Sequence, residues 1–226
     1  MTLALWAALG GTAYGGTMTT GSVLTSTKAA IAQQTGVHVV FRAIRGSSAT
    51  TEKIVADVGV TTGQETVSEG QSHLAVRVTP GYAYISGDSS GLTTIFGLTA
   101  AQAKKVGSDW VSWKAGAGQY ANLKADVTFT AVTALLPRAK GTRLSTGLTN
   151  GAKLYDLKWT VAASSSTPML SNTLTVSAGG QSLPVEQIST ASGGTKATTL
   201  LSGWGELVPA SAPPAASTIA SPKITH

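Results

Sequence analysis

The stretch SHLAVRVTPGYAYISG, residues 72–87, decides the fold class that the sequence predicts. In its first half apolar residues stand at every second position: Leu74, Val76 and Val78. This is the period of a strand with one buried face. A turn at TPG follows, and Tyr82 and Tyr84 then share one side of a second strand. The stretch therefore predicts two half-buried antiparallel strands.

Further strand patterns lie on both sides of this pair. Toward the N-terminus, VHVVFRAI (37–44) is rich in β-branched residues, and EKIVADVGV (52–60) places Ile54, Ala56 and Val58 on one face. We read TTGQE (61–65) as the turn to the next strand. Toward the C-terminus the predicted strands are DWVSWKA (109–115), TRLSTGLTNG (142–151), AKLYDLKWTVA (152–162), SNTLTVSAGG (171–180), SLPVEQIST (182–190) and TKATTLLSGWG (195–205).

Helical patterns open the chain and interrupt the strands. LTSTKAAIAQQTG (24–36) predicts a helix with Gly36 as its C-cap. Residues 91–107 predict a helix that breaks near Gly97 and restarts after the N-cap Thr99. Residues 118–138 are ambiguous, because β-branched residues favour a strand while an apolar stripe at helical spacing favours a helix. We favour the helix.

The order of helix, strands, central helices and strands predicts an α+β fold. We expect one large curved antiparallel sheet, a half-barrel, with helices packed across its concave face. Such a sheet leaves an apolar cavity beneath the helices. Residues 24–209 form the predicted single domain. Residues 1–23 read as a signal-like or disordered segment, and the Pro/Ala/Ser-rich residues 210–226 as an extended, mostly unpacked tail.

Composition and motifs exclude several classes of function. The net charge of +6 comes from scattered Lys and Arg without a basic run, so we expect no nucleic acid partner. The chain has no cysteine, which excludes disulfides and thiolate metal sites. Its three histidines lack the spacing of metal ligands. We therefore predict no metal site and no cofactor.

The stretch GDSSG (87–91) fits the nucleophile-elbow pattern, with Ser89 as the candidate nucleophile of a serine hydrolase. A serine nucleophile needs a base, and in hydrolases with this elbow the histidine follows the serine in the chain. The only histidine after Ser89 is the terminal His226. Gly, Asp and Ser also make ordinary turns. We therefore expect a turn from strand to helix, and a protein that is not an enzyme.

Three stretches resemble actinobacterial cell-envelope lipoproteins similar to LppX and LprG: TKAAIAQQTGVHVVF (27–41), the span from AYISGD to SDWVSW (83–113), and LSGWGELVPASAPPAAS (201–217). The resemblance covers about residues 24–219 and implies a LolA/LolB-like fold. It also implies a cavity for lipid acyl chains, an exported or cell-envelope location, and no catalysis. One difference is that Tyr14 stands where those lipoproteins carry a lipid-modified cysteine, which puts membrane anchoring in doubt.

Strand alternation and the helical stripe select the candidate cavity residues: Val39, Phe41, Val76, Tyr84, Ile95, Phe96, Leu98, Leu123 and Val127. The predicted function is binding or carrying a lipid or another hydrophobic ligand at a membrane or cell-envelope surface, as a monomer. The same residues would also suit the packed core that a large sheet needs. The alternative is therefore an envelope-associated structural or protein-interaction module with a filled core and no ligand.

Overall fold

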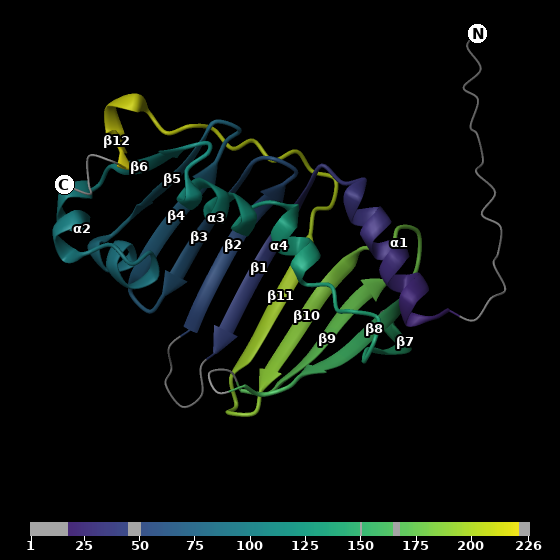
Figure 1. Ribbon diagram of the computed structural model, residues 1–226. Coiled ribbons are helices and arrows are strands. Elements are labelled where there is room, and N and C mark those ends of the chain that lie inside the picture. The colour runs from purple at the N-terminus through teal and green to yellow at the C-terminus, as the bar shows by residue number, and fades with distance from the viewer. Residues whose placement is uncertain (1–17, 45–50, 150, 165–167, 222–226) are drawn as a thin grey trace, which may run out of the picture.

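The structure is a computed structural model that describes residues 18–44, 51–149, 151–164 and 168–221. The signal-like features at residues 1–17, including Tyr14, lie outside the described residues. Twelve strands form one curved open sheet in the order β12-β6-β5-β4-β3-β2-β1-β11-β10-β9-β8-β7 (Figure 1). Every neighbouring pair is antiparallel except β12 and β6, which run parallel. The predicted α+β class with a half-barrel sheet is confirmed.

The first part of the sheet is a meander of five strands: β1 (Gly36–Ile44), β2 (Thr51–Gly59), β3 (Gly63–Glu69), β4 (Ser72–Val78) and β5 (Tyr82–Gly87). Strand β3 was not predicted, because we read its beginning as a turn. Its sequence GQETVSE contains one apolar residue, Val67, and therefore shows no hydrophobic alternation. Backbone pairing with β2 on one side and β4 on the other holds it in the sheet.

The second part is another meander: β7 (Arg143–Thr149), β8 (Ala152–Val161), β9 (Leu170–Ser177), β10 (Pro184–Ala191) and β11 (Lys196–Ser202). The two meanders join where β1 pairs with β11, which places Val39 opposite Leu201. This pairing makes a single sheet from strands at opposite ends of the chain.

Helix α1 (Thr20–Ala32) covers the inner face of β8 and β9, where its Val23 packs near Leu157. It begins before the predicted start, because the Thr19 and Ser22 side chains form a reciprocal capping box. It ends at Ala32, so Gly36 is not its C-cap and instead begins β1.

The central helical region agrees with its prediction. A π-helix (η1, Gly91–Ile95) precedes α2 (Ala100–Val106). The Thr99 side chain caps α2 by accepting a hydrogen bond from the backbone N–H of Gln102, and Gly107 ends it at a φ of +60°. Strand β6 (Trp110–Lys114) follows.

Helices α3 (Gly118–Asp126) and α4 (Phe129–Ala134) occupy the ambiguous segment, which confirms the preference for a helix. They lie across the concave face of the sheet (Figure 1). Their junction at Val127 lies directly on β3. The two backbones are so close that a Cβ at Gly63 would collide with the Val127 carbonyl. The lack of a side chain at Gly63 therefore lets the helix pair approach the sheet.

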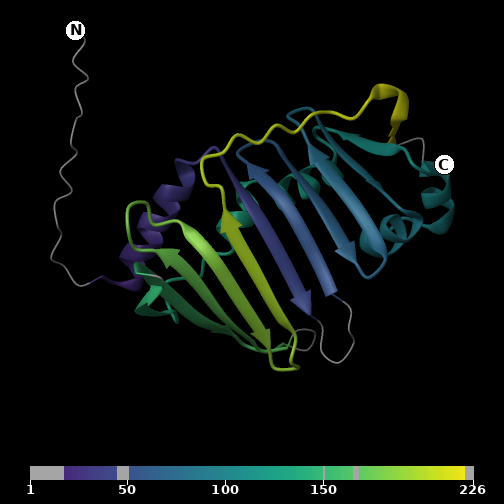
Figure 2. The same cartoon turned by 180° about the vertical axis from the view of Figure 1, so that it is seen from behind.

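The predicted extended tail pairs with the sheet over one short segment, Thr218–Ala220. After β11 the chain crosses the ends of the strands along one rim and ends in a short 3-10 helix (η2, Ala215–Ser217) and β12 (Thr218–Ala220) (Figure 2). Before the tail begins, the Thr35 hydroxyl donates to the carbonyl of Gly205 at 2.6 Å; within the tail, β12 pairs with β6. This pairing is made by free backbone groups at the edge of β6. The side-chain composition of the tail, from which an unpacked segment was predicted, does not indicate such backbone pairing.

Buried side chains on the concave face form three clusters, one beneath η1, α2 and α3, one beneath α4 and one beneath α1. Their centres include Val76, Ile85, Leu92, Val58, Val132, Leu157 and Leu174, each at most 2% exposed. None of the helices in the described ranges is long and apolar enough to cross a membrane.

Candidate functional site

An apolar cavity of about 170 Å³ lies between the concave face of the sheet and the helices α3 and α4. Strands β1, β2 and β11 form its floor, and α4 forms its roof. Its lining residues are Val39, Phe41, Ile54, Ala56, Val58, Glu65, Asp126, Ala131, Val132, Leu135 and Thr199. It occupies part of the region where a curved sheet was expected to leave apolar space.

Strand register explains which side chains meet in this cavity. Val39 on β1 lies opposite Ala56 on β2, which lies opposite Glu65 on β3. These residues therefore form one row across the concave face. Ala56 in the floor and Ala131 in the roof carry only methyl groups. Small side chains on both walls leave space that larger ones would fill.

Two carboxyl groups interrupt the apolar lining, Glu65 on β3 and Asp126 at the end of α3. Burial raises the pKa of Glu65 to about 7, and the negative charge of Asp126 adds to this effect. Burial also raises the pKa of Asp126. The charge on this wall of the cavity therefore changes near neutral pH.

Only two of the nine predicted cavity residues line this cavity, Val39 and Phe41. Six others belong to the packed cluster beneath η1, α2 and α3: Val76, Leu123, Val127, Ile95, Phe96 and Leu98. In this cluster the Phe96 and Trp113 rings lie 5.4 Å apart. The central helices cover this end of the sheet and fill the space above it.

Tyr84 is the ninth predicted residue and lies on the opposite, convex face. It pairs with Arg77 on β4, whereas Val76 and Val78 point to the concave side. Its ring lies 6.0 Å from that of Tyr82. Because side chains alternate along a strand, Tyr84 cannot line the cavity.

The sequence contained weak signals for the lining residues that were missed. Ile54, Ala56 and Val58 share one face of a predicted strand, and Val132 and Leu135 belong to the apolar stripe of the predicted helix at 118–138. No sequence pattern indicated that Glu65 and Asp126 would line the cavity. Hydrophobic alternation does not identify a carboxyl group that tertiary packing brings into an apolar cavity.

The GDSSG stretch is the predicted turn from a strand to a helix. The Asp88 carboxylate accepts hydrogen bonds from the backbone N–H groups of His73 at 2.9 Å and Gly91 at 2.6 Å. A Cβ at Gly91 would collide with the His73 carbonyl. The Ser89 side chain is exposed, and its backbone carbonyl accepts a hydrogen bond from the Thr93 hydroxyl. These contacts hold the turn together.

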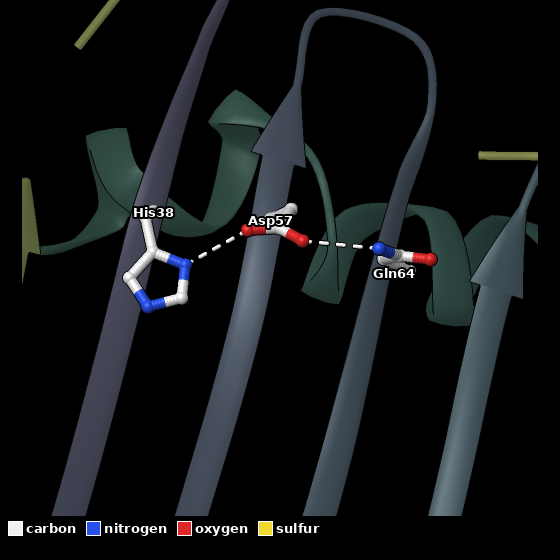
Figure 3. A network of polar contacts seen from close by, with 3 residues as sticks. All are labelled: His38, Asp57 and Gln64. Carbon is white, nitrogen blue, oxygen red and sulfur yellow. Dashed lines mark hydrogen bonds and ion pairs between the residues drawn. The ribbon is translucent and has the colours of Figure 1, made fainter. Parts of the chain in front are cut away.

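A polar network spans three strands on the convex face (Figure 3). His38 Nδ1 lies 2.8 Å from Asp57 Oδ1, and Gln64 Nε2 donates to Asp57 Oδ2 at 3.0 Å. The hydrogen bond with His38 is the largest cause of a lowered pKa at Asp57, against the opposing effect of burial. Among the described residues, no group of three or more His, Cys, Asp or Glu is placed to hold a metal ion.

No protein-family model matches the chain, and no curated protein matches it. Among solved structures, the Mycobacterium tuberculosis lipoprotein LppX is similar with a TM-score of 0.51 and 15% identity, over 84% of this chain and 99% of LppX. MucB gives a TM-score of 0.39 and 15% identity, over 84% of this chain and 60% of MucB. A DUF1329 family protein from Desulfovibrio piger gives a TM-score of 0.37 and 9% identity, over 86% of this chain and 96% of that protein. The similarity to LppX, with its TM-score of 0.51, shows that the chain has an LppX-like fold.

Proposed function

We propose that this protein is a non-enzymatic carrier or binding protein for a lipid or another hydrophobic ligand. The observation that carries the proposal is the apolar cavity between the concave sheet face and α3–α4. Apolar pockets with a few polar groups are the usual form of a small-molecule site. Transfer of ligand surface from water into such a cavity contributes about 0.8 kcal/mol for each buried CH₂ group.

The size of the cavity suggests how a ligand is accommodated. Its volume of about 170 Å³ is below the roughly 300–1,000 Å³ typical of sites for drug-sized ligands. In this conformation it takes only part of an acyl chain. The roof is the six-residue helix α4. In our proposal α4 moves outward when a longer chain binds.

The place of action is also a proposal. The likeness to a mycobacterial lipoprotein supports a location outside the cytoplasmic membrane, exported or in the cell envelope. There residues 24–209 would act as one domain and a monomer, with a lipid or the envelope surface as partner. Fractionation of the native host followed by immunoblotting tests the location.

A pair of alanine substitutions in α4 tests the cavity directly. Ala131 lines the cavity, whereas Ala134 in the same helix is exposed. Titration with the uncharged fluorophore N-phenylnaphthylamine should show that Ala131→Trp weakens binding by about tenfold or more, because the indole fills the cavity. Ala134→Trp should bind like the wild type. Equal affinity in the two variants would place the ligand elsewhere.

The alternative is a structural or protein-interaction module with a filled core. The observation in its favour is that six of the nine predicted cavity residues belong to or pack against the hydrophobic cluster beneath η1, α2 and α3. Native mass spectrometry of protein from its own host separates the two. A stoichiometric co-purifying lipid supports the carrier, while absence of both lipid and fluorophore binding supports the module.

A further inference from the structure

The charges that face the cavity are all of one sign. Its lining in the described part of the chain contains two ionisable side chains, Glu65 and Asp126. Strands β1, β2 and β11 and helix α4 contribute only apolar side chains and Thr199 to it. Both ionisable side chains of the described cavity lining are therefore acidic.

The basic residues of the same part of the sheet lie on the other face. In strands β1 to β6 these are Arg42, Lys53, Arg77 and Lys114, and register places all four on the convex side. Arg77 stacks there on the ring of Trp110 at 4.8 Å. On α3, the Lys124 ammonium lies 5.9 Å from the Tyr120 ring. The net charge of +6 of the whole chain is therefore reversed at the cavity.

This separation of charge affects which ligands can bind. An anionic head group would meet a like charge at the half-buried Glu65, where screening by solvent is weak, and a second, more strongly screened like charge at the exposed Asp126. An uncharged hydroxyl or a cationic amine can donate hydrogen bonds to the same carboxyl oxygens. Both kinds of ligand would bury the same alkyl chain against β1 and β2.

We infer that the cavity selects amphiphiles by charge: it takes those whose polar end is uncharged or cationic and rejects anionic ones. This inference rests on the proposed function and names the ligand class of the same cavity. The polar end lies beside Glu65 and Asp126, and the chain lies toward Val39 and Phe41.

The selection should depend on pH. Because the pKa of Glu65 is raised to about 7, this carboxyl is neutral in mildly acidic solution and charged in mildly alkaline solution. Asp126, on the facing helix, is the other ionisable group of the lining and adds its own charge. Rejection of an anion should therefore strengthen as the pH rises through about 7.

Competition against bound N-phenylnaphthylamine tests the inference. The competitors are decanol, decylammonium and decanesulfonate, which share an alkyl chain and keep their charge states between about pH 5 and about pH 9. All are used below their micelle concentrations. At about pH 9 the sulfonate should compete about tenfold or more weakly than the ammonium compound. At about pH 5 the difference should shrink several-fold.

The double variant Glu65→Gln, Asp126→Asn keeps the side-chain shapes and removes both charges. It should lose most of the discrimination at about pH 9, with little change in the affinity for decanol. The matched control Glu186→Gln, Asp156→Asn removes two carboxylates from the convex face and should discriminate like the wild type. Sulfonate competing as well as the ammonium compound in the wild type would overturn the inference while the proposed function stood. Failure of the fluorophore and all competitors to bind would overturn the proposed function and the inference together.

Discussion

Replacement of Glu65 by glutamine should stabilise the protein in alkaline solution and leave it nearly unchanged in acid. The carboxyl lies in an apolar wall beside Asp126, and its pKa is raised from 4.5 to about 7. In the folded state it therefore holds its proton more tightly than in the unfolded chain. Its favourable contribution is fully present below pH 4.5 and is lost as the pH rises through about 7.

The magnitude follows from the size of the pKa shift. One pKa unit corresponds to about 1.4 kcal/mol, so the ionised carboxylate costs the folded state about 3 kcal/mol above pH 7. The glutamine side chain of the variant has a similar shape and does not ionise. The variant should therefore exceed the wild type by up to about 3 kcal/mol in its free energy of unfolding at about pH 9, and differ by less than about 1 kcal/mol at about pH 4.

Urea denaturation followed by tryptophan fluorescence measures both values, since the chain has five Trp residues. Glu186→Gln is the matched control, because it makes the same replacement on the convex face of β10. The control should show no comparable gain at alkaline pH. A Glu65→Gln effect of the same size and sign at both pH values would refute the reasoning, because it would arise from packing and not from ionisation.

Three further predictions concern the fold. Gly63→Ala should destabilise the protein by about 1–3 kcal/mol in urea, because the new methyl collides with the Val127 carbonyl, while Gly81→Ala, which meets no atom within 4 Å, should change it little. Trp204→Phe should cost about 1 kcal/mol by losing a 3.0 Å hydrogen bond to the first carbonyl of β10; an unchanged urea midpoint would contradict that contact. Deletion of residues 211–226 removes β12 and should lower the melting temperature in calorimetry, whereas an unpacked tail predicts no change.

Local patterns predicted most strands and the central helices. Alternation at Leu74, Val76 and Val78 corresponds to β4, and Thr99 and Gly107 mark the ends of α2 as expected. These signals depend on side chains and backbone groups within a few residues of each other. Strand β3 lacked such a signal. It is held by backbone hydrogen bonds to β2 and β4, and the pattern of its own side chains does not indicate this pairing.

The candidate site depended on contacts that no local pattern contains. Val39 and Phe41 line the cavity, whereas Ile95, Phe96 and Leu98 pack against a separate hydrophobic cluster. Which part of the concave face stays open depends on where the helices cross it.

The sequence by itself determined the periodicity of its strands, the caps of its central helices and the α+β class, because these follow from sterics and hydrogen bonds within short segments. The tertiary structure decided that β1 pairs with β11 and that the tail pairs with β6. It also decided that Glu65 lies in an apolar wall beside Asp126. The physical reason is that burial, charge and edge pairing act between groups far apart in the chain, and only folding brings those groups together.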